Sequence, residues 1–76
     1  MSHHTLDARR LLCPMPVIKT QNAVAKLAPG DTIEVISTDP GALNDIPAWC
    51  RVHGHKIVQT HSDEDEIRIT LQVDGS

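Results

Sequence analysis

With 76 residues, of which 39% are hydrophobic, the chain can build one small domain, 1–76, and not a second core. Its net charge of -3 and its single aromatic residue, Trp49, argue against direct nucleic-acid binding, which uses basic faces and stacking aromatics. It has neither an apolar run of membrane-spanning length nor a signal peptide, so we expect a cytoplasmic protein with no membrane partner and with reduced cysteines.

The first two predicted elements are a short strand and a helix. Residues 3–8 predict an edge strand centred on Leu6. Residues 14–27 predict a helix, which Pro29-Gly30 ends. At helical spacing, its inward face carries Pro16, Val17, Thr20, Ala23, Val24 and Leu27.

The next two predicted elements are an alternating strand, 32–38, and a second helix that ends at Gly54. The helix has a stripe of residues expected to be buried: Leu43, Ile46, Trp49, Cys50 and His53. Proline inside a helix loses a hydrogen bond and clashes with the preceding turn. We therefore expect an irregular start, with Asp45 as the cap and Pro47 in the first regular turn.

Two strands, 56–61 and 66–73, complete the chain, with the acidic residues 63–66 as a solvated hairpin tip. The order βαβαββ predicts an α/β (α+β) fold, a two-layer sandwich. Right-handed crossovers place two helices on one face of a four-stranded mixed sheet.

The sequence Cys13-Pro14-Met15-Pro16 stands where the first helix should begin. Cys13 takes the expected N-cap position, and Pro14 the first helical position, where its fixed φ suits a helix. Pro16 removes one more N–H from the first turn, so we expect the Met15 N–H to be the local hydrogen-bond partner of the sulfur. The motif predicts a rigid, exposed cysteine.

Positive charge around this cysteine favours its thiolate. The helix N-terminus carries partial positive charge, and Arg9, Arg10 and Lys19 add full charges nearby. A Cys-x-x-Cys motif would place a second thiol at Pro16, and that thiol would attack a persulfide on Cys13 and release sulfide. The sequence therefore favours a persulfide carrier over a redox protein.

These residues resemble the signature of the TusA (SirA-like) family of sulfur-carrier proteins. The resembling segments run through most of the chain: Leu6-Asp7, Leu11, Cys13-Pro14-Met15-Pro16-Val17, Pro29-Gly30-Asp31-Thr32, Thr38-Asp39-Pro40, Asp45-Ile46-Pro47-Ala48-Trp49-Cys50 and Gly54-His55. The resemblance implies the βαβαββ sandwich and a sulfurtransferase that carries sulfur covalently on Cys13 without another cofactor.

The resemblance also implies partners. The expected sulfur donor is a cysteine desulfurase or a rhodanese, and the expected acceptor is a DsrE-type sulfur-relay complex. Such relays serve tRNA thiolation, molybdenum cofactor synthesis or the oxidation of reduced sulfur. The protein is expected to turn over only with these partners, and the sequence does not identify which it uses.

Three residues depart from the family pattern. Arg10 stands where the family usually has glycine, so the loop must differ or bear strain if that glycine adopts a positive φ. Leu12 replaces a commonly polar or basic residue, and Met15 replaces a commonly acidic one. The surroundings of Cys13 are therefore expected to be more electropositive than is typical.

Other interpretations remain open at this point. A regulatory interaction module with an incidental cysteine is one, and a thiol-disulfide oxidoreductase that joins Cys13 to Cys50 is another. We expect Cys50 to be buried and structural. We expect no metal site, because the cysteines and histidines fit no zinc spacing. Asp7 and Asp39 are expected to orient loops near Cys13 through side-chain-to-backbone hydrogen bonds.

Overall fold

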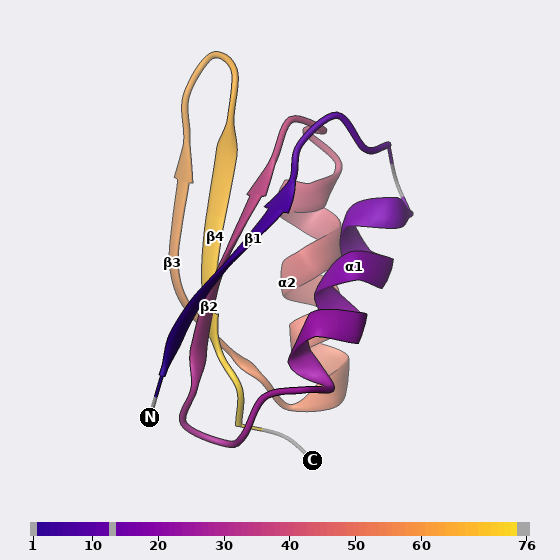
Figure 1. Ribbon diagram of the computed structural model, residues 1–76. Helices are drawn as coiled ribbons and strands as arrows, with labels where there is room; N and C mark the ends of the chain where they lie inside the picture. Colours follow the sequence, from indigo (N-terminus) through magenta and orange to yellow (C-terminus); the bar gives the residue numbers. More distant parts are fainter. Residues whose placement is uncertain (1, 13, 75–76) are drawn as a thin grey trace.

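The structure is a computed structural model that describes residues 2–12 and 14–74. It contains the expected βαβαββ order, and both helices cover the same face of the sheet (Figure 1). The elements are β1 (His3–Ala8), α1 (Met15–Val24), β2 (Thr32–Ser37), α2 (Ala42–His53), β3 (Lys56–Ser62) and β4 (Ile67–Gln72). The predicted two-layer sandwich is confirmed.

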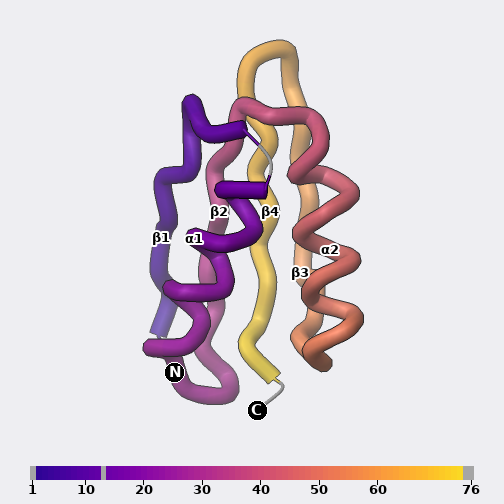
Figure 2. The backbone as a smooth tube through the Cα atoms, turned by 90° about the vertical axis from the view of Figure 1, so that its right-hand side faces the viewer, coloured from indigo at the N-terminus to yellow at the C-terminus, as the bar shows by residue number. Residues whose placement is uncertain are grey.

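The four strands form one mixed sheet in the order β1-β2-β4-β3. β1 pairs with β2 in parallel, and β4 pairs antiparallel with both β2 and β3. Because β1 and β2 run in the same direction, the loops that follow them lie at the same end of the domain (Figure 2). Both helices consequently begin at that end, where residues 9–14 connect β1 to α1.

The core lies between the sheet and the two helices. The expected inward face of α1 is confirmed, because Pro16, Thr20 and Val24 are buried and its other members pack against the core. β2 and β4 alternate between buried and less buried positions as their sequences predict, whereas β3 is exposed at every position except Ile57. The buried apolar residues are Ala8, Val24, Ile33, Val35, Ala42, Ile46, Cys50, Ile67, Ile69, Leu71 and Val73.

Helix α1 begins one residue later and ends three residues earlier than the sequence predicts. Pro14 is its N-cap, with φ -93° and ψ 11°, so the first helical residue is Met15. After Val24 the chain continues in tight turns, in which the Leu27 N–H donates to the Val24 carbonyl at 3.0 Å. Pro29 disfavours helical geometry only at Ala28, so it limits the helix to the residues before Ala28 but does not explain the end at Val24.

Helix α2 corrects the expected position of Pro47. The helix already begins at Ala42, so Pro47 lies in its interior, and no side chain makes a capping hydrogen bond at its start. Asp45 is therefore a first-turn residue and not the cap. The helix runs without a break from Ala42 through Pro47, so the irregular start expected from Pro47 is not observed. At its first turn the Gly41 carbonyl accepts from both Asn44 (3.1 Å) and Asp45 (2.9 Å), as is common at helix ends.

The buried stripe of α2 is narrower than predicted. Ile46 and Cys50 are buried as expected, but Leu43 and His53 are exposed. The earlier start of the helix accounts for part of the difference, because it places Ala42 in the stripe instead of Leu43. No helix in the described part of the chain is long and apolar enough to cross a membrane.

Candidate functional site

The candidate site is the start of α1 and the loop before it. Cys13, the predicted sulfur-carrying residue, lies outside the described residues. Its sequence neighbours are described: Pro14 is the N-cap of α1, and the Leu12 carbonyl accepts a hydrogen bond from Met15, the first residue of that helix. The geometry of the site is therefore given by the residues on either side of Cys13.

The start of α1 is electrostatically suited to an anion. Its N-cap, Pro14, makes no side-chain hydrogen bond, and no acidic residue lies in its first turn. The partial positive charge of the helix N-terminus is therefore not offset by a carboxylate of its own. This helix start follows Cys13 directly in sequence.

Pro16 fixes the first turn of α1 to the core. Its side chain is fully buried, and its carbonyl accepts a hydrogen bond from the Thr20 hydroxyl at 2.8 Å. Pro14, by contrast, is exposed. The predicted rigid turn is thus supported by one proline that packs inside and one that limits the backbone outside.

The Met15 N–H makes a hydrogen bond within the chain just before α1. It donates to the Leu12 carbonyl at 2.9 Å, closing a turn across residues 12–15. Pro14, and not the predicted Cys13, is the N-cap of α1, and the Met15 N–H is the first backbone donor after it. The predicted partner of this N–H, the Cys13 sulfur, lies outside the described residues, so a contact between the two stays a prediction.

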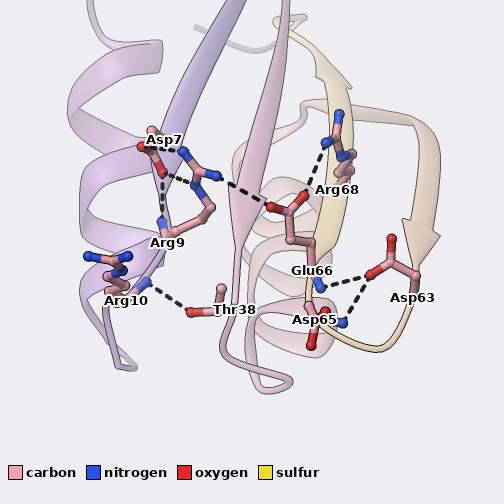
Figure 3. Close-up of polar contacts among 8 residues, drawn as sticks. All are labelled: Asp7, Arg9, Arg10, Thr38, Asp63, Asp65, Glu66 and Arg68. Atoms are coloured by element: carbon pink, nitrogen blue, oxygen red, sulfur yellow. Dashed lines mark hydrogen bonds and ion pairs between the residues drawn. The ribbon is translucent and has the colours of Figure 1, made fainter.

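Arg9 is held within the protein by two carboxylates (Figure 3). Its Nε and Nη2 donate to the Asp7 carboxylate at 2.9 and 3.1 Å, and its Nη1 donates to Glu66 Oε2 at 3.4 Å. The Arg9 side-chain hydrogen bonds, followed by its backbone hydrogen bond, lower the pKa of Asp7 to about 2. Arg9 is thus a paired cation, whose positive charge is partly offset by the carboxylates of Asp7 and Glu66.

Glu66 links this loop to the β3–β4 hairpin. Its second carboxylate oxygen accepts from Arg68 at 3.0 Å, and its N–H donates to Asp63 Oδ1 at 2.9 Å. The hairpin tip is exposed as expected, but Glu66 takes part in a contact across 57 residues of chain. No local signal in the sequence marks such a long-range pair, so sequence reasoning missed Glu66.

Arg10 adopts a left-handed backbone conformation with φ 66°, the only positive φ of a non-glycine residue in the described ranges. Its N–H donates to Thr38 Oγ1 at 2.9 Å, which joins the β1–α1 loop to the residue after β2. Two outcomes were expected for a loop with arginine in place of glycine, namely a different loop conformation or a strained residue. The positive φ of Arg10 is the strained outcome. The role of Thr38 was not predicted.

The remaining predicted cation, Lys19, is exposed one turn into α1. It lies near enough to Asp7 to contribute a small electrostatic lowering of that pKa. The loop-orienting roles of Asp7 and Asp39 are confirmed. Asp7 accepts from the Arg9 N–H at 3.0 Å, and Asp39 accepts from the Gly41 N–H at 3.0 Å.

Apolar side chains are exposed on both sides of Cys13 in sequence. Leu12 is 77% exposed, Met15 42% and Ile18 41%. Exposed apolar side chains near a rigid loop are typical of surfaces that other proteins contact.

Cys50, the second thiol, is buried in α2 with an exposed fraction of 1%. Burial raises its pKa to about 11, so it remains a protonated thiol at neutral pH. The expectation of a buried cysteine is confirmed. Among the described residues, no group of three or more histidine, cysteine or acidic side chains is placed to hold a metal ion.

Comparison with known proteins gives consistent matches. Residues 4–73 match the family model described as "Sulfurtransferase TusA". The chain is 38% identical over 71 residues to "Putative sulfur carrier protein YrkI" of Bacillus subtilis (strain 168), covering 93% of this chain and 95% of that protein. It is 33% identical over 72 residues to "Putative sulfur carrier protein NMA0882" of Neisseria meningitidis serogroup A, covering 95% of this chain and 97% of that protein.

The fold has a counterpart among solved structures. A SirA-like protein from Desulfitobacterium hafniense superposes with a TM-score of 0.82 at 23% identity, covering 93% of this chain and 97% of that one. The fold and the sequence matches together define a sulfur-transfer protein. The chain belongs to the TusA family.

Proposed function

We propose that this protein accepts sulfane sulfur as a persulfide on Cys13 and passes it to a cysteine of an acceptor protein. The observation that carries the proposal is the start of α1, which follows Cys13 directly and has neither a capping side chain nor an acidic residue in its first turn. Such a helix start favours the anionic forms that both steps require. Membership of the TusA family supports the same role.

The two transfer steps are exchanges at sulfur. In loading, the Cys13 thiolate attacks the outer sulfur of a donor persulfide, the donor S–S bond breaks, and the donor cysteine leaves as a thiolate. In delivery, an acceptor thiolate attacks the outer sulfur of the Cys13 persulfide, and Cys13 leaves as a thiolate. The electron pair of each broken bond stays on the leaving sulfur, so neither step needs an external oxidant or reductant.

The chain provides a sulfur site but little acid–base assistance. Asp7 is the carboxylate nearest in sequence before the loop, and Arg9 holds its pKa at about 2. A group this acidic is a poor general base near neutral pH. Deprotonation of the incoming thiol is therefore assigned to the partner, which agrees with a carrier that turns over only in a relay.

The partners proposed are those of the family. The donor is a cysteine desulfurase or a rhodanese, and the acceptor is a DsrE-type sulfur-relay complex, in tRNA thiolation or in sulfur oxidation within the cytoplasm. The exposed side chains of Leu12, Met15 and Ile18 support a function that depends on contact with other proteins.

An oxidoreductase that forms a Cys13–Cys50 disulfide is disfavoured. Cys50 is buried, and its raised pKa keeps it protonated, whereas thiol-disulfide exchange needs an accessible thiolate. If the protein were an interaction module with an incidental cysteine, its Cys13→Ser variant would retain full biological activity. The sulfur carrier and the oxidoreductase would both lose activity in this variant.

Intact-mass measurement tests the proposal. Reduced wild-type protein and the Cys13→Ser and Cys50→Ser variants are incubated with polysulfide, or with a cysteine desulfurase and cysteine. We expect a reductant-sensitive gain of sulfur in the wild type and in Cys50→Ser, and none in Cys13→Ser. Absence of the gain with every donor would leave the interaction module as the better account.

A further inference from the structure

We infer that Arg10 is a docking cation that selects acceptor cysteines lying in acidic protein surfaces. The inference rests on the proposed function and adds to it the chemistry of the partner. It follows from three observations, namely the backbone conformation of Arg10, the different states of the two adjacent arginines, and the apolar surface beside them.

The conformation of Arg10 is energetically unfavourable for a residue with a Cβ. At φ 66° such a residue is less stable than glycine by about 1 kcal/mol, and only its surroundings keep it there. The hydrogen bond from its N–H to Thr38 Oγ1 uses the backbone, which glycine would offer equally. Arginine therefore does not stabilise the fold relative to glycine at this position. Any advantage of arginine over glycine comes from its side chain.

The two neighbouring arginines differ in what their guanidinium groups contact. That of Arg9 is paired with Asp7 and Glu66, and these bonds raise its pKa. The Arg10 side chain makes no hydrogen bond or ion pair with any residue in 2–12 or 14–74 that the structure records, and Figure 3 shows it pointing away from Glu66 and Asp65. A cation without an internal partner can pair with an incoming carboxylate without breaking an existing bond.

The surface beside Arg10 indicates that the carboxylate belongs to a protein. Leu12, two residues on, is 77% exposed, and Met15 and Ile18, one helical turn apart on α1, are also exposed apolar side chains. A small inorganic anion makes no favourable contact with exposed apolar side chains. A protein interface, by contrast, combines an apolar centre with charged groups at its rim. The complementary surface has acidic residues around its acceptor cysteine.

The charge also acts at the right step. An acceptor thiolate must approach the outer sulfur of the Cys13 persulfide, form the new S–S bond and displace Cys13 as a thiolate. Two negative sulfurs approach each other in this step, and a nearby cation reduces such repulsion. Arg10 lies in the loop that leads to Cys13. Acidic residues on the acceptor repel the persulfide anion, and their pairing with Arg10 offsets this repulsion.

A peptide competition tests the inference. Protein loaded to completion with polysulfide and desalted is offered two synthetic peptides of equal length, each with one cysteine, flanked by glutamates in one and by glutamines in the other. The measured quantity is the ratio of the two transfer rates at low salt. We expect this ratio to be about threefold higher in the wild type than in Arg10→Gly, the effect of one exposed ion pair.

Two further variants control for general charge. Arg10→Lys keeps the cation and is expected to retain most of the wild-type ratio. Lys26→Gln removes the same charge from an exposed position after α1, and is expected to leave the ratio unchanged. High salt should reduce the ratio of the wild type toward that of Arg10→Gly, because exposed charges are screened.

The outcomes separate the inference from the proposed function. If the wild type takes up no sulfur, the proposed function fails at the loading step, and the inference falls with it. If the wild type loads and delivers sulfur but Arg10→Gly has the same ratio, or Lys26→Gln lowers it equally, the proposed function stands and the role of Arg10 is refuted.

Discussion

The Arg10 N–H donates to Thr38 Oγ1 at 2.9 Å, and this bond joins the loop before α1 to the residue that follows β2. It forms while Arg10 has a φ of 66°. The same loop is held on its other side by Arg9, which reaches Glu66 on the hairpin. The loop that leads to Cys13 is therefore tied to the ends of two neighbouring strands, since Thr38 follows β2 and Glu66 precedes β4.

Replacing Arg10 with glycine is expected to stabilise the fold. Glycine removes the steric cost of the positive φ, and its greater freedom in the unfolded chain offsets part of the gain. We expect the free energy of unfolding in urea to rise by about 0.5–1 kcal/mol. Arg10→Lys is the control, since it keeps the Cβ and should show no gain. An Arg10→Gly variant less stable than the wild type would refute the strain.

Removal of the Thr38 hydroxyl should loosen the loop. In Thr38→Val the Arg10 N–H loses its acceptor, and we expect a loss of about 0.5–1 kcal/mol in unfolding free energy, the usual contribution of one hydrogen bond. Amide exchange at Arg10 should accelerate in this variant. Thr38→Ser retains the oxygen and should behave as the wild type, and equal exchange rates in all three proteins would contradict this role.

The Asp7–Arg9 pair predicts a pH dependence at acid pH. The folded pKa of Asp7 is lowered from 3.8 to about 2. A lowered folded pKa means that the unfolded state binds the proton first as pH falls, so this contribution to stability is complete above pH 3.8 and is lost between there and pH 2. NMR titration of the Asp7 carboxyl should show the lowered value in the wild type.

The matched variant for this titration is Arg9→Gln, which removes the positive charge and keeps hydrogen-bonding capacity. We expect the pKa of Asp7 to return toward 3.8 in this variant, because its largest cause is the Arg9 side-chain hydrogen bond. A pKa of Asp7 that is unchanged by the substitution would show that Arg9 is not paired with it in solution, and would restore Arg9 as an available cation.

Cys50 should be unreactive in the folded protein. Its burial and its pKa of about 11 leave almost no accessible thiolate at neutral pH. In a Cys13→Ser background, iodoacetamide should modify Cys50 only when urea unfolds the protein. Modification at the same rate with and without urea would contradict the buried position and reopen the possibility of a second reactive thiol.

The sequence predicted the fold well because the signals for it are local. The alternation of Ile67, Ile69 and Leu71 and the spacing of Pro16, Thr20 and Val24 each identify a buried face without knowledge of the partner element. The position of Pro47 within α2 was predicted wrongly because it depends on where the helix begins, and that depends on the hydrogen bonds of the first turn. That turn forms around the Gly41 carbonyl, which no propensity indicates.

The site was predicted only in part, for a similar reason. The rigid turn and the helix start follow from the prolines and are local features. The pairing of Arg9 with Glu66 brings together residues from opposite ends of the chain, and only the folded sheet places them side by side. The Arg10 conformation was anticipated as one of two alternatives, and its hydrogen bond to Thr38 shows which is realised.

The most direct test of sulfur carriage follows an isotopic label from donor to acceptor. Protein loaded with a heavy sulfur isotope is desalted and mixed with a second thiol protein, and the intact masses of both are measured. The account predicts that the label leaves Cys13 and appears on the acceptor as a persulfide, and that Cys13→Ser delivers none. Release of the label as free sulfide, with a disulfide formed on this protein, would contradict carriage and identify redox chemistry instead.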